Sequence, residues 1–217
     1  MTDLLVLGGS GRLGMHVLAR AAARGHRVRT LVRNPEAVQA PAGVELVQGT
    51  PADIDDLRKA AQGSEAIISA LNNSRASENP WAKPLSPPMF MTDATRDTLT
   101  VMGEQNIRRI VVTSTQGAGD DWARINPVLR ALIQRSTLKA AYDDHHGVDQ
   151  IICASDNDWT LARPVTLSNK PAGAPLRAAE AGTDKPGTRI SRADFLQDTV
   201  EQGTWIHKAP LVWNTRG

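Results

Sequence analysis

Short apolar runs alternate with longer segments of helical periodicity along the chain. The runs predicted to be strands end at residue 7 or span 26–32, 44–47, 64–71, 108–113, 159–163 and 211–215. The segments predicted to be helices span 12–24, 53–61, 89–105, 121–135, 137–154 and 191–202. This alternation predicts an α/β fold, a doubly wound (Rossmann) parallel sheet with helices on both faces. We expect a single domain over residues 1–217, with an irregular segment on the substrate side at 165–190.

The turns that follow the expected strands carry the most unusual residues of the chain. They lie at residues 8–14, 33, 50, 71–73, 114–116 and 164. Ligands of doubly wound sheets bind outside the carboxyl ends of the strands, so we expect these turns to meet in one crevice. The polar loop at 72–88 is long for a connection and is a candidate lid over that crevice.

The first of these turns has the spacing of a dinucleotide site, with glycines at Gly8, Gly11 and Gly14 between an apolar run and a helix. Gly8 permits a tight turn, Gly11 lets a phosphate approach the backbone, and Gly14 lets the helix pack closely on the sheet. The start of the helix offers N–H groups and a partial positive charge. We therefore expect a pyrophosphate to bind here.

The residue after the second strand bears on the choice of cofactor. An acidic residue there would bind the ribose 2′-hydroxyl of NAD, but this chain has Arg33, which favours the 2′-phosphate of NADP. Arg12, inside the glycine turn, is a second candidate for that phosphate. The alternative is that both arginines are ordinary solvated surface residues.

Composition excludes several other classes of protein. The net charge is only +2, and no basic run with interleaved aromatic residues predicts nucleic-acid binding. No apolar run reaches the roughly 20 residues of a membrane span, and no secretory leader is expected. The single cysteine, Cys153, is expected in the core and suits a reducing cytoplasm, where we expect the protein to reside.

Five segments together resemble one family: GGSGRLG at the start, LVRNP, MTDATRDTL, RRIVVTSTQGAGD and DNDWTLARP. Over nearly its whole length the chain resembles the atypical short-chain dehydrogenases/reductases of the NAD(P)H-binding, NmrA-like kind. Within that group it is similar to the flavin reductase and biliverdin-IXβ reductase type. The later segment ISRADFLQDTV fits the same pattern.

The resemblance implies roles for individual residues. The pyrophosphate would be held by Gly8, Ser10, Gly11, Arg12 and Leu13, with Gly14 behind them. Arg33 would pair with the 2′-phosphate, while Thr50 stands where many relatives have an aspartate near the adenine. The ribose, nicotinamide and substrate would be lined by Leu71, Asn72, Asn73, Thr113, Ser114, Thr115 and Pro164, with Arg75 a basic residue of the loop.

The chain departs from the family in its catalytic helix. Typical short-chain reductases use a Tyr-x-x-x-Lys pair, and here Ala141 falls on the tyrosine position and His145 on the lysine position. Tyr142 is one residue away from the tyrosine position. The flavin-reductase-like relatives share this lack and carry two aspartates before the histidine, as in Asp143-Asp144-His145. We expect these two aspartates, and His146, to lie on the helix surface.

These observations favour an NADPH-dependent reductase that transfers hydride to a conjugated small molecule, such as a flavin, a quinone or a related tetrapyrrole. Ser114, Thr115 and His145 are the candidate catalytic residues; His145 is alternatively an exposed helix residue. A second hypothesis is an NADP-binding redox sensor without turnover, and a sugar-nucleotide epimerase ranks lowest. We expect no metal, no nucleic acid and no membrane partner, and a monomer in preference to a dimer.

Overall fold

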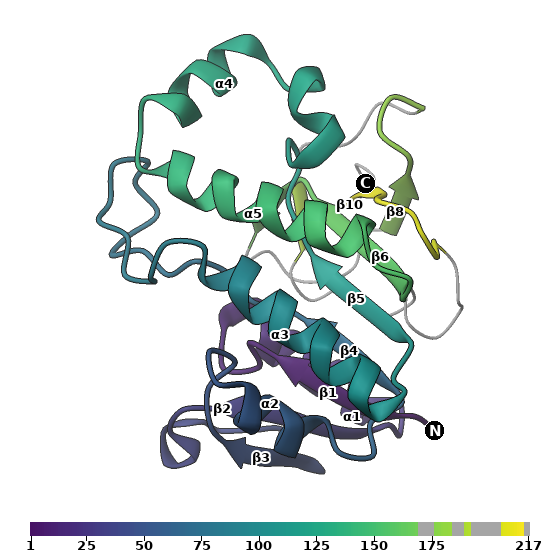
Figure 1. The fold of residues 1–217 in the computed structure, drawn as a ribbon. Coiled ribbons are helices and arrows are strands. Elements are labelled where there is room, and N and C mark those ends of the chain that lie inside the picture. Colours follow the sequence, from purple (N-terminus) through teal and green to yellow (C-terminus); the bar gives the residue numbers. More distant parts are fainter. Residues whose placement is uncertain (169–175, 184–188, 192–204, 215–217) are drawn as a thin grey trace.

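Seven parallel strands and one antiparallel strand form the main sheet in the computed structural model, which describes residues 1–168, 176–183, 189–191 and 205–214 (Figure 1). The order of the eight strands is β3-β2-β1-β4-β5-β6-β10-β8. The parallel strands are β1 (Asp3–Leu7), β2 (Arg27–Val32), β3 (Val44–Gln48), β4 (Ala66–Ser69), β5 (Arg109–Thr113), β6 (Asp158–Pro164) and β10 (Leu211–Asn214), and β8 (Leu176–Ala179) is antiparallel. This confirms the predicted doubly wound fold.

Helices cover both faces of the sheet because its central strands are apolar on both sides. Leu5 and Leu7 of β1 pack into one buried cluster with α2, α3 and α5, which lie in front of the sheet in Figure 1. Leu4 and Val6, which alternate with them, pack into a second cluster with α1 on the opposite face. The helices are α1 (Arg12–Ala23), α2 (Ile54–Ala61), α3 (Phe90–Gln105), α4 (Pro127–Gln134) and α5 (Leu138–Cys153).

The register at the centre of the sheet aligns the carboxyl ends of neighbouring strands. Leu7, the last residue of β1, pairs with Leu31 of β2 and with Ser69 of β4. Val112 of β5 pairs in turn with Ser69. The turns after these strands therefore emerge along one edge of the sheet, as the sequence analysis expected.

The second half of the chain differs from the sequence-based expectation in two places. The expected irregular segment at 165–190 contains three strands, β7 (Thr166–Ser168), β8 (Leu176–Ala179) and β9 (Arg189–Ser191). β8 pairs antiparallel with β10 (Leu211–Asn214), which itself pairs with β6. These strands escaped detection because their short runs lie among glycine and proline residues.

The expected helix at 121–135 is instead a 3-10 helix, η2 (Gly119–Arg124), followed by α4. Pro127 is the first residue of α4, where its missing N–H group costs no hydrogen bond. A second 3-10 helix, η1 (Pro35–Ala37), follows β2. The expected helix at 191–202 lies almost wholly outside the described residues. Among the helices that the structure describes, none is long and apolar enough to cross a membrane.

Candidate functional site

A cleft of about 1040 Å³ opens at the carboxyl ends of the parallel strands. The turns after β1, β2, β3, β4, β5 and β6 form its wall, together with part of α5. Most of the residues selected from the sequence line it: Gly8, Ser10, Gly11, Arg12, Leu13, Arg33, Leu71, Asn72, Asn73, Thr113, Ser114, Thr115, His145 and Pro164. Gly14 is the exception, because it lies behind the wall, between α1 and the sheet.

The turn after β1 leaves the amino end of α1 open to the cleft. Gly8 has a φ of +77°, a conformation that favours glycine. A Cβ atom on Gly14 would lie 2.1 Å from the carbonyl oxygen of Gly8, so glycine is required for this close packing. Gly11 precedes α1 without a capping side chain, and the first turn of α1 holds no acidic residue. The first N–H groups of α1 are therefore suited to bind an anion.

The two arginines near this turn differ in their contacts. The Arg12 guanidinium lies 2.6 Å from the Glu78 carboxylate, which belongs to the long loop. Arg33 is exposed and has neither a hydrogen bond nor an ion pair with any residue that the structure describes. Beyond Arg33 the wall continues at Thr50, whose N–H group donates to the Asp56 carboxylate at 2.8 Å. Arg33 is therefore the cation at this end whose charge no described neighbour compensates.

Asp144 lies beneath the cleft wall, fully buried, and the expectation that it lies on the helix surface is wrong. Its carboxylate accepts hydrogen bonds from the N–H groups of Met91 and Thr92, at 3.0 and 2.8 Å. Those groups belong to the first turn of α3, which has no capping side chain of its own. The carboxylate also accepts from Asn73 Nδ2 at 2.9 Å and thereby orients a residue of the cleft wall.

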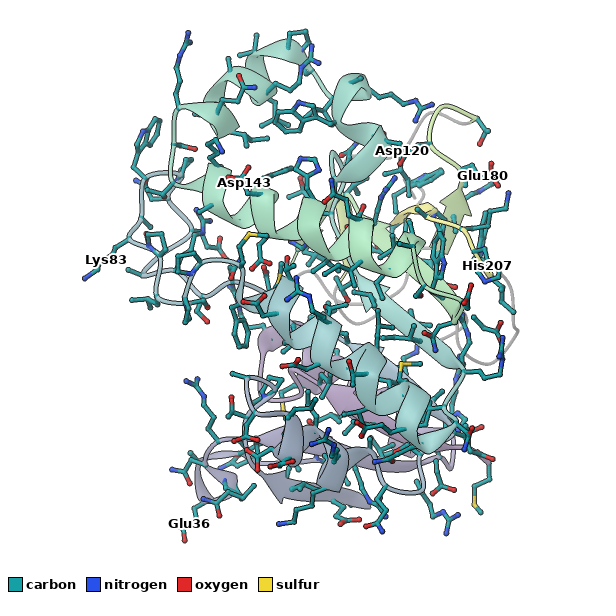
Figure 2. The ribbon with its side chains drawn as sticks, in the orientation of Figure 1. Glu36, Lys83, Asp120, Asp143, Glu180 and His207 are labelled. Carbon is teal, nitrogen blue, oxygen red and sulfur yellow. The ribbon has the colours of Figure 1, made fainter. Side chains whose placement is uncertain are left out.

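A second buried aspartate holds the end of β5. Ser114 Oγ donates to Asp149 Oδ1 at 2.7 Å, and the Arg163 guanidinium donates to Asp149 Oδ2 at 2.7 Å. Arg163 also bonds Asp120, which lies in η2 next to the end of α5 in Figure 2. Burial acts to raise the pKa of Asp120, but the hydrogen bond and the charge of Arg163, together with the charge of Arg124, hold that pKa below its usual range. The network fixes the Ser114 side chain at the cleft.

His145 is buried at the cleft wall, which contradicts the alternative of an exposed helix histidine. Burial lowers the pKa of the His145 imidazole by more than the negative charges of Asp149 and Asp144 raise it. The ring is therefore neutral at neutral pH. Three buried polar atoms of the wall have no hydrogen-bond partner among the described residues: His145 Nδ1, Thr113 Oγ1 and Asn73 Oδ1. A wall with such atoms is suited to a polar ligand, and a nicotinamide riboside offers the hydroxyl and amide groups to bind them.

Tyr142 and His146 lie on another side of α5 and line a separate cavity of about 240 Å³. The Tyr142 hydroxyl donates to the Gln116 carbonyl at 3.3 Å, and burial raises its pKa. His146 is half-buried, and its Nδ1 accepts from the Gly119 N–H at 2.9 Å. No tyrosine therefore lines the described part of the main cleft. Ala141 stands at the position of the usual acid.

The loop between β4 and α3 crosses the mouth of the cleft and is internally bonded. Arg75 and Pro84 form a bridge between its two arms. The Thr137 hydroxyl, at the start of α5, lies within hydrogen-bond distance of the carbonyls of Pro80 and Ala82. Lys83, at the loop tip, points away from the molecule in Figure 2. The contact with Thr137 at one side of the cleft and the ion pair between Glu78 and Arg12 at the other anchor the loop.

The sequence analysis missed the residues that support the site from behind. Asp149 and Arg163 lie within an ordinary amphipathic helix and an apolar strand, and no local pattern marked them. Glu78 was hidden in a polar loop. Cys153, expected in the core, is exposed at the end of α5. Only Asp144 had a signal in the sequence, since it stands beside the histidine in the catalytic helix.

Comparisons with known proteins agree with this geometry. A family model described as NAD(P)H-binding matches residues 8–200. Among solved structures, the chain is similar to ChuY, an anaerobilin reductase from Escherichia coli O157:H7, with 18% identity, a TM-score of 0.80, and 100% of this chain and 98% of that one covered.

Two further structures show the same fold. A short-chain dehydrogenase/reductase from Veillonella parvula, solved in complex with NADP, has 14% identity and a TM-score of 0.74 over 99% of this chain and 95% of that one. The oxidoreductase ylbE from Lactococcus lactis has 16% identity and a TM-score of 0.79 over 99% and 91%. The match of the family model over most of the length is what shows the family. The chain belongs to the NAD(P)H-binding family, whose cofactor is a nicotinamide dinucleotide.

Proposed function

We propose that the protein is an NADPH-dependent reductase that transfers hydride to a planar conjugated acceptor, such as a flavin or a tetrapyrrole. The observation that carries the proposal is that the described residues lining the cleft include no tyrosine, the usual acid, at the expected site of reaction. Ala141 replaces the usual tyrosine, Tyr142 lies outside the cleft, and His145 is neutral through burial.

Preference for NADPH over NADH rests on Arg33. Its guanidinium lies at the cleft wall just after β2, where a ribose 2′-phosphate is expected, and no described residue compensates its charge. Gly8, Ser10, Gly11 and the amino end of α1 would hold the pyrophosphate. Asn73, Thr113 and Pro164 would contact the nicotinamide riboside.

The chemistry follows from what the wall provides. A bound reduced nicotinamide supplies a hydride, which carries two electrons to the acceptor, and the balance is completed by one proton from solvent. A ketone needs that proton in the transition state from a positioned acid, whereas a flavin or a similar conjugated ring accepts hydride without one. The described wall supplies orientation, and proximity then provides most of the rate acceleration.

The size of the cleft supports two ligands at once. Its volume of about 1040 Å³ lies at the upper end of the roughly 300–1000 Å³ of small-molecule sites. The similarity to ChuY, an anaerobilin reductase, supports a tetrapyrrole as one acceptor to be tried. The same lack of an acid also suits a redox sensor, which binds NADP and regulates a partner without turnover.

Turnover separates the two candidates. Purified protein is mixed with NADPH and, in turn, a flavin, a tetrapyrrole and a quinone, and the loss of nicotinamide absorbance is followed. The reductase proposal expects catalytic loss with at least one acceptor. Tight binding of NADP without turnover of any acceptor would instead identify a sensor.

A further inference from the structure

Two buried aspartates of α5 lie directly behind the cleft wall, and each binds a side chain of that wall. Asp144 is 0% exposed and accepts from Asn73 Nδ2; Asp149 is 3% exposed and accepts from Ser114 Oγ. Neither aspartate lines the cleft itself. Their hydrogen bonds reach a bound ligand through the two side chains that they hold.

Asp149 determines which hydrogen-bonding role is left to Ser114. An ionised carboxylate only accepts hydrogen bonds, so the single hydroxyl proton of Ser114 points to Asp149. Arg163, which is 2% exposed, lies 2.7 Å from the other carboxylate oxygen and forms a buried ion pair with Asp149. Toward the cleft Ser114 Oγ therefore presents only lone pairs.

Asp144 has the same effect on Asn73. Because the carboxylate can only accept, the Asn73 amide must direct Nδ2 toward it and leave Oδ1 as the remaining polar atom. Oδ1 is buried at the cleft wall and has no partner among the described residues. Two side chains from different strand ends thus offer oxygen acceptors in fixed orientations.

We propose that Ser114 recognises the electron acceptor by accepting a hydrogen bond from its ring N–H group, and that Asp149 is the positioning residue that fixes this polarity. The inference rests on the proposed function and names its substrate class, a planar heterocycle with an imide, lactam or pyrrole N–H. A simple quinone offers only carbonyl oxygens, to which Ser114 has no proton to donate. Recognition through N–H therefore favours flavins and tetrapyrroles over quinones.

Binding of two flavins that differ in one N–H group tests the proposal without requiring turnover. Lumiflavin has an imide N–H at position 3, and 3-methyllumiflavin has a methyl group there. Quenching of flavin fluorescence gives both dissociation constants in the presence of saturating NADP⁺. We expect the wild-type protein to bind the methylated flavin about tenfold more weakly, the loss of one hydrogen bond. Equal binding of the two flavins overturns the proposal.

Variants assign the discrimination to the network. Ser114→Ala keeps the buried Asp149–Arg163 pair and is expected to bind both flavins alike. Asp149→Asn supplies an amide that donates to Ser114 Oγ, which frees the hydroxyl proton, and is also expected to lose the discrimination. Ser155→Ala is the matched control, because its hydroxyl bonds a carbonyl at the far end of α5. Discrimination that survives in Ser114→Ala contradicts the assignment.

The cofactor is the other source of an N–H donor, through its carboxamide. The 3-acetylpyridine analogue of NADP⁺ replaces that amide by a methyl ketone. If Ser114 serves the acceptor, Ser114→Ala changes the dissociation constants of NADP⁺ and of the analogue by the same factor. A loss confined to NADP⁺, together with equal binding of the two flavins, overturns the proposal. Discrimination between flavins without any turnover would instead contradict only the reductase function.

Discussion

The guanidinium of Arg12 and the carboxylate of Glu78 lie 2.6 Å apart and join the amino end of α1 to the loop across the cleft. Both side chains are largely exposed, so the pair itself contributes little stability. The position of the pair matters more, because the Glu78 carboxylate is bound to the guanidinium that a cofactor phosphate would approach.

Removal of this competing carboxylate should strengthen cofactor binding. We expect Glu78→Gln to lower the dissociation constant of NADP⁺ by about two- to fivefold, the usual size of an exposed ion pair. Calorimetric titration measures the change. Glu180→Gln, which breaks another exposed ion pair, with Lys208, is the control and should leave the constant unchanged. Weaker binding by Glu78→Gln would show that the loop contact supports the site instead.

A charge reversal at Arg33 should change the choice of cofactor. We expect Arg33→Asp to weaken NADP⁺ binding by about 10- to 100-fold, because a charge-assisted contact to phosphate is lost, while NAD⁺ binds as well as before or better. Arg177→Asp makes the same charge change on β8, at the opposite edge of the sheet, and controls for net charge. An unchanged ratio of the two affinities would place the 2′-phosphate elsewhere.

Adjacent aspartates on α5 should differ sharply in their effect on stability. Asp144→Ala leaves the N–H groups of Met91 and Thr92 without their acceptor, and we expect a loss of about 3 kcal/mol in the free energy of unfolding. Asp143→Ala removes only an exposed ion pair with Lys139 and should stay within about 0.5 kcal/mol of wild type. Urea unfolding measures both, and similar losses for the two variants would refute the capping role of Asp144.

Burial of His145 should make stability fall in mild acid. Its folded-state pKa lies below the value in the unfolded chain, so the unfolded state binds more protons as the pH falls below about 6.5. The stabilising contribution is present above that pH and is lost as the pH falls toward the folded-state pKa.

Unfolding at neutral pH and at mildly acidic pH checks this expectation. Wild type should lose more stability between the two conditions than His145→Gln, in which the titrating group is absent. His16→Gln, at an exposed position of α1, should behave as wild type. An identical pH dependence in wild type and His145→Gln would mean that His145 titrates normally.

The sequence was sufficient for the parts of the site that depend on local backbone rules. The glycine spacing predicted the turn after β1 and the packing of Gly14, and the strand ends predicted which turns would meet. It was insufficient where contacts join distant segments. The bonds from Ser114 and Arg163 to Asp149 connect β5, β6 and α5, and no periodicity in one segment reveals such a network.

The strands after β6 escaped prediction for a related reason. Thr166–Ser168 and Leu176–Ala179 are only three and four residues long, and pairing with distant strands, more than local propensity, stabilises them. By contrast, the expected core position of Cys153 was wrong because the residue lies at the last turn of α5, where the buried face of the helix ends.

One variant blocks the cofactor site while it preserves the fold. Gly11 precedes α1 with extended backbone angles, and a Cβ there would meet only the Gly8 carbonyl oxygen, at 3.2 Å. Aspartate is a favourable residue at this helix position, so Gly11→Asp should unfold within about 1 kcal/mol of wild type. Its carboxylate would occupy the first N–H groups of α1 and repel the pyrophosphate, so NADP⁺ binding should fall at least about 100-fold.

The most direct measurement is the rate of NADPH oxidation with lumiflavin by wild type and by Gly11→Asp, at equal protein concentration and with unfolding checked in both. We expect multiple turnovers by wild type and a rate no higher than that without protein for the variant. Tight NADP⁺ binding by wild type without oxidation of NADPH, with lumiflavin or with a tetrapyrrole, would contradict the reductase function.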